Sequence, residues 1–276
     1  MVYILYNPLA NNGDGEKGTD EVKAAFSGEN PELRDLTALD VKAFLTGLTA
    51  QDEVILCGGD GTIHRLVNAL DGVCPAVPVR LWRFGTGNDF IRDTEEDPTA
   101  ESVLLNDHMK NLPCAEVDGQ RHWFLNGCGG GVDALVCAKM NGALGKKAGY
   151  ASVAVSSFFK DFKTVSARVT VDGETMEFDR VWMAGAMNGR YQGGGMIFAP
   201  GQDRRSDKVC LYLWHGTGRL GTLLHFPSII KGTHGKYTKH CVLRFGREIT
   251  VEFSAPQFLQ LDGETLSGVT RFTVRK

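Results

Sequence analysis

The first hundred residues alternate short apolar runs with segments that have helical spacing. The runs that predict β-strands are 2–6, 33–36, 53–57 and 79–83, and the segments that predict helices are 16–26, 40–48 and 63–70. Asp40 stands at the N-cap position of its helix. Because a helix follows each of the first three strands, this order predicts an open parallel sheet covered by helices on both faces. Ligands of such sheets bind beyond the carboxyl ends of the strands.

After about residue 110 the pattern changes to alternating strands separated by Asp-Gly turns. Such turns occur at Asp118, Asp172 and Asp262, and helical patterns interrupt the strands at 132–140 and 150–159. We therefore predict an α/β domain over residues 1–110 and an antiparallel β domain over residues 111–276. A joint between two domains is a favoured place for a small-ligand site.

Composition excludes several classes of protein. The chain has 276 residues, 42% of them hydrophobic, a net charge of -3 and a pI near 6.2, which indicates a globular protein and gives no reason to expect nucleic acid as a partner. Its seven cysteines form no C-x-x-C pair, so we expect reduced core residues. No apolar stretch approaches the roughly 18 residues of a spanning helix, and the start MVYILYNP does not read as a signal peptide. We expect a cytoplasmic protein.

The segment ILCGGDGTIHRLVNAL raises the first question of chemistry. It places a loop between a strand and a helix, and the loop consists of Gly58, Gly59, Asp60, Gly61 and Thr62. Glycines at a helix N-terminus let backbone N–H groups approach a phosphate. A carboxylate there would repel phosphate unless a divalent cation stands between them, so Asp60 predicts a bound metal. The alternative is that Asp60 caps the helix that follows it.

A second loop of the same kind follows the next strand. Its residues are Gly85, Thr86, Gly87, Asn88 and Asp89. Two such loops on neighbouring parallel strands lie at the same edge of the sheet and together suit a polyphosphate with its metal.

Two other phosphate-binding motifs fit the sequence less well. Residues 13–18 match G-x-G-x-x-G, with Asp35 at about the distance of a ribose-binding acid, which would indicate a dinucleotide-dependent oxidoreductase. Six residues separate that motif from the preceding strand, whereas its first glycine should follow the strand directly. A Walker-type loop does not occur in the sequence.

These residues resemble the diacylglycerol kinase catalytic family, which includes sphingosine and ceramide kinases and a bacterial lipid kinase branch. The resemblance rests on Asn7-Pro8, the two glycine loops and Asp262-Gly263-Glu264, together with FLNGCGGGVDALV, AMNGRYQGGGMIFAP and FLQLDGE in the second half. It implies an N-terminal α/β nucleotide-binding domain, a C-terminal antiparallel β-sandwich, ATP with Mg²⁺, and a lipid hydroxyl as acceptor.

The resemblance also implies roles for individual residues. The residues that would hold the nucleotide are Asn7, Pro8, Gly58, Gly59, Asp60, Gly61, Thr62, Gly85, Thr86, Asn88, Asp89 and Arg92. Asp60 and Asp89 would join a metal and water network. Asp262 would be the general base, supported by Glu264. From spacing alone this last role stays open, because Asp172-Gly173-Glu174 is the same tripeptide and both copies suit a hairpin turn.

Two departures from the family pattern affect the metal sites. Asn111 stands where the bacterial branch usually has an aspartate, so the metal network would have one charge fewer. The family's Asp-Asp-Gly metal loop is replaced by APGQDRRSD, in which Asp203 and Asp207 either bind a structural cation or form surface ion pairs with basic neighbours.

The predicted partner is a lipid substrate at a membrane surface, reached by peripheral contact only. The apolar segment 219–230, followed by Lys and His, could line a lipid entrance, although stripes of this kind are more often core. A homodimer is left open. The alternatives to a lipid kinase are a soluble-metabolite kinase similar to NAD kinase and a nucleotide-binding regulatory protein that has lost catalysis.

Overall fold

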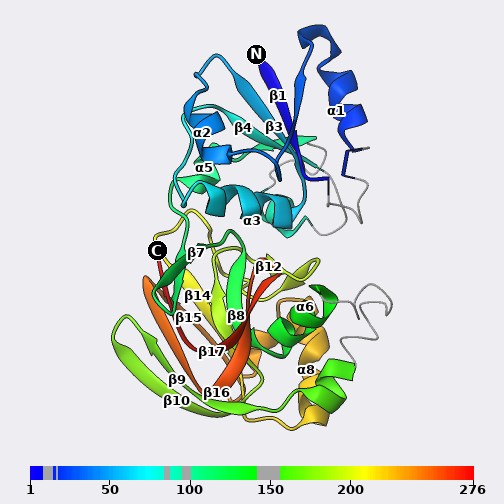
Figure 1. Ribbon diagram of the computed structural model, residues 1–276. Helices are drawn as coiled ribbons and strands as arrows, with labels where there is room; N and C mark the ends of the chain where they lie inside the picture. Colours follow the sequence, from blue (N-terminus) through cyan, green and yellow to red (C-terminus); the bar gives the residue numbers. More distant parts are fainter. Residues whose placement is uncertain (9–14, 17, 84–87, 95–100, 142–155) are drawn as a thin grey trace. The chain divides into compact units, whose positions relative to one another are not determined.

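The computed structural model describes residues 1–8, 15–16, 18–83, 88–94, 101–141 and 156–276. The chain divides into two compact units, Met1–Leu112 and Pro113–Lys276 (Figure 1). Each unit has its own sheet and its own apolar core.

The N-terminal unit is built around a five-stranded sheet. Its strands are β1 (Val2–Tyr6), β2 (Glu32–Asp35), β3 (Glu53–Gly58), β4 (Val79–Arg83) and β5 (Ser102–Leu104). Its helices are α1 (Thr19–Ala25), η2 (Ser27–Glu29), α2 (Val41–Thr46), α3 (Asp60–Ala69), α4 (Asp89–Thr94) and α5 (Asn106–Met109). The order is β2-β1-β3-β4-β5, with β5 antiparallel at the edge and the other pairs parallel. The predicted parallel sheet is confirmed, and β5 was missed because three residues carry too little pattern.

Helices cover both faces of this sheet, as the pattern predicted. Val2 and Ile4 pack with Val22 of α1, whereas the Tyr3 ring meets the Phe44 ring of α2 edge-on at 5.1 Å between centroids. Because successive side chains of a strand point to opposite faces, α1 and α2 lie on opposite sides of β1.

Helix boundaries follow the capping chemistry. Asp40 is the N-cap of α2, as predicted, and its Oδ1 accepts a hydrogen bond from the Ala43 backbone N at 3.0 Å. Helix α1 begins three residues later than predicted, at Thr19, and α3 begins three residues earlier, at Asp60. The early start of α3 brings Asp60 into the first helical turn.

The C-terminal unit is antiparallel throughout its described pairs. Its strands are β6 (Cys114–Val117), β7 (Gln120–Trp123), β8 (Gly127–Gly131), β9 (Val165–Val171), β10 (Glu174–Val181), β11 (Met183–Met187), β12 (Tyr191–Gln192), β13 (Met196–Ile197), β14 (Val209–Trp214), β15 (Cys241–Gly246), β16 (Glu248–Leu261) and β17 (Glu264–Arg275). Its helices are α6 (Val132–Asn141), the π-helical turn η3 (Ser157–Asp161), α8 (Arg219–Ile230) and η4 (His234–Lys236). Of the predicted helix 150–159, residues 150–155 lie outside the described residues.

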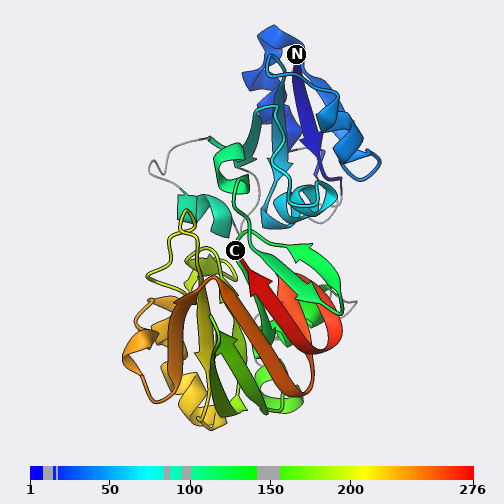
Figure 2. The same cartoon turned by 90° about the vertical axis from the view of Figure 1, so that its left-hand side faces the viewer.

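The ten-stranded sheet of this unit folds into two layers, with β8, β11, β14 and β15 in one and β9 and β10 in the other. One long hairpin, β16–β17, joins these layers (Figure 2). The first part of β16, residues 249–253, pairs with β9, and its last part, residues 259–261, pairs with β8. The register shifts between these parts, so that β16 bends from one layer into the other. A core that includes Phe124, Phe253 and Phe272 lies between them. The turn of this hairpin carries Asp262.

None of the seven cysteines, all of which the structure describes, forms a disulfide; Cys57, Cys128, Cys210 and Cys241 are buried, whereas Cys74, Cys114 and Cys137 are half-buried. Burial raises the pKa of the Cys57 thiol to about 12. A thiol of this kind is protonated at neutral pH and is a poor nucleophile. The prediction of core cysteines is therefore confirmed for the four buried thiols and wrong for the three half-buried ones.

Candidate active site

Three parallel strands end together at one edge of the N-terminal sheet. Tyr6 of β1 pairs with Cys57 of β3, and Cys57 pairs with Trp82 of β4. The described segments that follow β1 and β3, Asn7-Pro8 and the loop at Gly59, therefore leave the sheet side by side. The residues directly after β4 lie outside the described part of the chain.

Packing explains why one position of the first loop must be glycine, but it does not explain another. A Cβ atom at Gly58 would lie 2.2 Å from the Thr62 Oγ1, and Thr62 is only 3% exposed. Glycine is needed at Gly58 so that the first turn of α3 can close against the end of β3. At Gly61 no described atom lies within 4 Å of the Cβ position. The glycine at 61 is therefore not required by packing, which leaves its backbone open to a ligand.

The Asp60 carboxylate ties the two predicted loops together. Its Oδ2 accepts a hydrogen bond from the Asp89 backbone N at 2.9 Å, and its Oδ1 accepts one from the Phe90 backbone N at 3.0 Å. Asp60 thus caps α4, whereas the N-cap of its own helix is Gly59. The alternative in which Asp60 caps the helix that follows it is wrong, because the side chain spans to the N-terminus of the neighbouring helix.

The second loop is described only from Asn88 onward. Asn88 has a φ of 44°, in the left-handed region that asparagine tolerates, and Asp89 in the first turn of α4 is 5% exposed. Arg92 lies on the exposed side of the same helix. Gly85 and Thr86 lie outside the described residues.

The donor set at this edge fits Mg²⁺ that is shared with a phosphate. Asp60 and Asp89 supply hard carboxylate oxygens on adjacent helix N-termini. Among the residues that the structure describes, no three His, Cys, Asp or Glu side chains cluster to form a complete metal cage. Mg²⁺ commonly uses one or two carboxylates and takes its other ligands from substrate phosphates and water.

In the C-terminal unit, Asp262 is held by three consecutive backbone amides. Its Oδ2 accepts from the Leu125 N at 2.7 Å, and its Oδ1 accepts from the Asn126 N at 2.8 Å and the Gly127 N at 3.1 Å. In return the Asp262 N donates to the Gly127 O at 3.0 Å. These bonds join the turn of the β16–β17 hairpin to the loop before β8 and fix the direction of the carboxylate.

A second layer of polar residues, which the sequence pattern did not predict, supports that loop. Asn188, which is 2% exposed, donates from Nδ2 to the Leu125 O at 2.8 Å. The guanidinium of Arg204 donates to the Asn126 Oδ1 at 3.0 Å, and the Lys276 Nζ donates to the Asn188 Oδ1 at 2.6 Å. Burial, with a smaller effect of nearby Arg204, lowers the pKa of Lys276 to about 8. The Asn-Gly pairs at 126 and 188 were the only sequence feature that could have indicated this layer, but by themselves such pairs predict turns.

The remaining predicted residues lie in ordinary surface surroundings. Glu264 is exposed at the start of β17. Asp207 forms an ion pair with Arg247, which lowers the pKa of Asp207, and the Asp203 Oδ1 accepts from the Arg205 N at 2.9 Å. These contacts favour surface pairing over a structural cation at Asp203 and Asp207. Asn111 is exposed in the turn before β6.

The residues that suggested a dinucleotide site have structural roles instead. Gly15 is buried, and a Cβ atom there would lie 1.9 Å from the Asn7 carbonyl O. The Asp35 Oδ1 accepts from the Thr37 N and Oγ1, both at 2.7 Å, within its own turn. Gly15 is therefore required by the close approach to β1, and Asp35 stabilises a turn.

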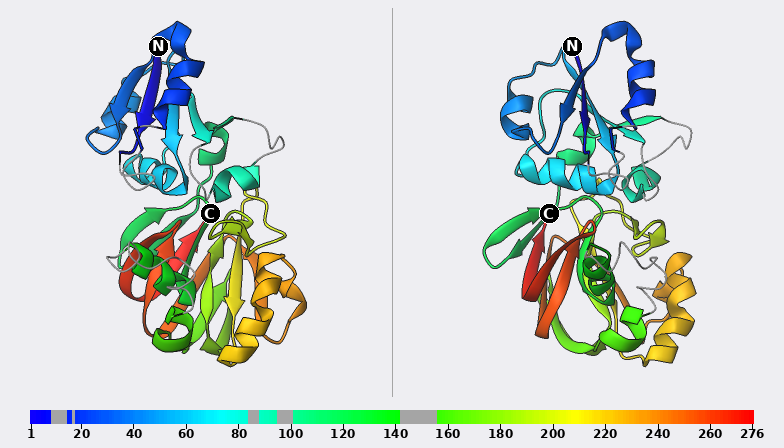
Figure 3. Two further views of the ribbon diagram at one scale, coloured as in Figure 1. Left: turned by 90° about the vertical axis from the view of Figure 1, so that its right-hand side faces the viewer. Right: turned by 45° about the vertical axis from the view of Figure 1, so that its right-hand side comes forward.

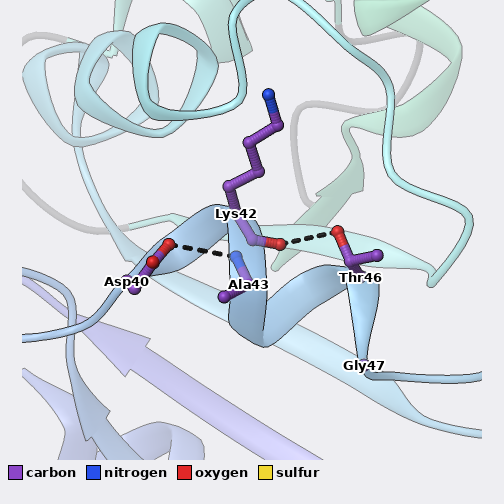
Figure 4. A pocket seen from close by; sticks show the side chains of 5 residues that line it. All are labelled: Asp40, Lys42, Ala43, Thr46 and Gly47. Atoms are coloured by element: carbon purple, nitrogen blue, oxygen red, sulfur yellow. Dashed lines mark hydrogen bonds between the residues drawn. The ribbon is translucent and has the colours of Figure 1, made fainter.

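A shallow hollow lies over α2, away from the predicted site residues (Figure 4). It is lined by Asp40, Lys42, Ala43, Thr46 and Gly47. Asp40 caps the helix there, and the Thr46 Oγ1 donates to the Lys42 O at 2.7 Å. The Asp40 and Thr46 side chains of this hollow therefore serve the helix itself.

Comparison with known proteins places the chain in a family. The diacylglycerol kinase catalytic domain model matches residues 1–117, and the model of the YegS C-terminal NAD kinase β-sandwich-like domain matches residues 127–274. A diacylglycerol kinase of Mycobacterium tuberculosis is 24% identical over 84% of this chain and 79% of its own length. A probable lipid kinase YegS-like of Pseudomonas aeruginosa is 27% identical over 94% and 88%.

A solved structure shows the same fold. A diacylglycerol kinase crystal structure from Bacillus anthracis superposes with a TM-score of 0.63 at 19% identity, covering all of this chain and 93% of its own. In the described part of the chain, no helix has both the length and the apolar character needed to cross a bilayer. The two matched domain models together account for nearly the whole sequence, and the chain therefore belongs to the diacylglycerol kinase family, in its bacterial lipid kinase branch.

Proposed function

We propose that this protein is a Mg²⁺-dependent kinase that transfers the γ-phosphoryl group of ATP to a lipid hydroxyl, on diacylglycerol or a related lipid. The observation that carries the proposal is the Asp60 carboxylate, which binds the amides of Asp89 and Phe90 and so joins the first glycine loop to the start of α4. Membership of the family and the names of its relatives support the lipid acceptor.

The edge of the N-terminal sheet would hold the nucleotide. Asn7 follows β1 at that edge, and the open backbone at Gly61 together with the N-terminus of α3 suits phosphate oxygens. Asp60 and Asp89 would hold Mg²⁺, which neutralises charge on the phosphates when it is bound. Arg92, exposed on α4, would contact the same phosphates.

Asp262 would accept the proton of the lipid hydroxyl. In the proposed step a bond forms between the hydroxyl oxygen and the γ-phosphorus, and the bond from that phosphorus to the β–γ bridging oxygen breaks. The hydroxyl proton passes to the carboxylate and ADP leaves. A base must be correctly aimed at the proton it takes, and the three amides of residues 125–127 orient the Asp262 carboxylate.

A radiolabelled ATP assay tests the proposal. The protein is incubated with labelled ATP, Mg²⁺ and a panel of extracted lipids, nucleosides and sugars, and we expect label in the lipid fraction. Asp60→Ala should weaken ATP binding because the two loops lose their link, whereas Asp20→Ala, on the exposed start of α1, should not. Label in water-soluble products alone would contradict the lipid acceptor, and no transfer to any acceptor would contradict the kinase.

A further inference from the structure

Helix α8 presents a row of large apolar side chains to solvent. These are Leu220 (73% exposed), Leu223 (46%), Leu224 (79%), Phe226 (38%) and Ile230 (48%). Most of the exposed large apolar side chains among the described residues belong to this one helix. Exposed apolar residues that gather in one patch, unlike scattered ones, mark a binding surface.

The hydroxyl side chains of α8 point inward instead. Thr222 and Ser228 are 3% and 8% exposed. The Thr222 hydroxyl lies 2.6 Å from the Thr217 hydroxyl, which in turn accepts from the Trp214 Nε1 at 3.0 Å. The helix therefore exposes apolar residues and buries hydroxyl groups, whereas a helix at a water-facing surface is expected to expose its polar residues. The prediction that this apolar segment is core is wrong for its outer face, because buried polar residues anchor the helix to β14.

The charged residues of the chain segment that contains this face are basic. No Asp or Glu occurs between Asp207 and Glu248, in a chain whose net charge is -3. The same stretch carries several exposed basic side chains at both ends of α8 and just beyond it, namely Arg219, Lys231, Lys236 and Lys239. An apolar face with a basic border is complementary to a lipid surface with anionic headgroups.

The helix is held firmly enough to present this face. The Arg219 guanidinium donates to the Phe162 O at 2.9 Å, and Ile229 is 3% exposed in the core of the unit. Its end is continuous with the turn that leads to η4, where the Lys231 N donates to the Pro227 O and the Thr233 N to the Ser228 O. Figure 3 shows α8, coloured yellow to orange, along the outer side of the C-terminal unit.

We propose that the outer face of α8, residues 219–230, docks the protein on an anionic lipid bilayer, with the helix lying in the plane of the interface. The five apolar side chains enter the boundary between headgroups and acyl chains, and the basic border contacts the phosphates. This inference rests on the proposed lipid kinase function for its purpose, since a lipid acceptor must be met at the interface. Binding to vesicles nevertheless occurs without catalysis and can be measured alone.

Cosedimentation with vesicles tests the apolar part. The full chain is mixed with vesicles of phosphatidylcholine that contain 30% phosphatidylglycerol, and we expect Leu220→Glu/Leu224→Glu to lower the bound fraction at least about tenfold. Val73→Glu is the matched control, because Val73 is 59% exposed in the N-terminal unit. Unchanged thermal unfolding of the variants shows that the fold is kept. Equal binding of the double variant and the wild type would overturn the proposal.

The basic border has its own test. Lys231→Gln/Lys236→Gln/Lys239→Gln should weaken binding to the anionic vesicles by roughly a hundredfold, since each lysine near such a surface contributes about fivefold. The control replaces three exposed basic side chains away from α8, Lys42→Gln/Lys110→Gln/Arg121→Gln. Binding should also fall with added salt. Equal binding to pure phosphatidylcholine vesicles would contradict the choice of an anionic surface.

A second copy of the chain is the competing occupant of this face. Light scattering after size exclusion distinguishes this dimer from a membrane contact. The proposal would be overturned if the wild type is a dimer that does not bind vesicles and Leu220→Glu/Leu224→Glu converts that dimer to a monomer. A short-chain diacylglycerol, kept below the concentration at which it aggregates, separates the two hypotheses. If the proposed function holds, wild type and double variant phosphorylate it equally. If no lipid is phosphorylated, the vesicle experiment still decides the role of α8.

Discussion

The tripeptide Asp-Gly-Glu occurs twice in this protein and makes the same turn twice. Asp172 and Gly173 have φ of 49° and 87°, and Asp262 and Gly263 have φ of 50° and 96°. Each turn links two long antiparallel strands. This is the backbone that Asp-Gly favours in two-residue hairpins, so the local sequence determines the local structure in both places.

The surroundings of the two turns differ. The Asp172 Oδ1 accepts from the backbone N of Arg247 and Glu248, both at 2.9 Å and both exposed. Its neighbour Glu174 pairs with Arg244, which lowers the pKa of Glu174. Exposed ion pairs of this kind add little to stability.

The turn at Asp262 meets a buried polar layer instead. Three amides of residues 125–127 bind the carboxylate, and buried Asn188 fixes the loop that supplies them. The comparison teaches that the turn motif carries no function by itself. What differs is how rigidly the aspartate is held and by what.

The largest expected difference between the two turns is in activity. Asp262→Ala should lower kcat/KM for phosphoryl transfer at least about a hundredfold, because a positioned proton acceptor commonly contributes 10²–10⁴-fold. Asp172→Ala should stay within about twofold of the wild type. Both are measured in the labelled ATP assay, with ATP affinity followed by thermal shift as a check that the nucleotide site is intact. An active Asp262→Ala variant, or an equal loss of activity in Asp172→Ala, would show that the two turns do not differ in function.

The next largest effect is on stability, at the buried polar residues that support the loop around Asp262. Asn188→Ala removes the donor to the Leu125 O and the acceptor of Lys276, so the free energy of unfolding should fall by about 1–3 kcal/mol. Thr175→Ala, which removes an exposed Thr170–Thr175 hydrogen bond beside Asp172, should cost under about 0.5 kcal/mol. Urea unfolding measures both. Similar losses at the two sites would show that the buried layer does not stabilise the loop.

A further effect is a pH dependence near the Asp262 turn. The pKa of Lys276 is lowered to about 8 in the folded chain, against about 10.4 for an exposed lysine. Between these values the unfolded chain binds more protons, so the free energy of unfolding should rise with pH through this window. Lys276→Met should flatten that rise, whereas Lys163→Met, at an exposed position of the same unit, should not. Identical slopes for wild type and Lys276→Met would contradict the assignment.

The fold was largely predictable from local patterns. Short apolar runs predicted β1 through β4, and Asp40 predicted the start of α2, because both are short-range effects. The roles of Asp60 and α8 were not predictable in this way. Asp60 binds amides about 30 residues further along the chain, and the outward face of α8 follows from polar contacts with Trp214 and Thr217 that periodicity does not show.

The sequence by itself determined the parallel sheet, the antiparallel second half, the glycine loops and the family, since these depend on residue types at fixed spacing. Only the tertiary structure decided which of two identical Asp-Gly-Glu turns is clamped by three amides, and which face of an apolar helix is left to solvent. The physical reason is that backbone geometry follows from neighbours in the chain, whereas burial and hydrogen-bond partners follow from residues that folding brings together.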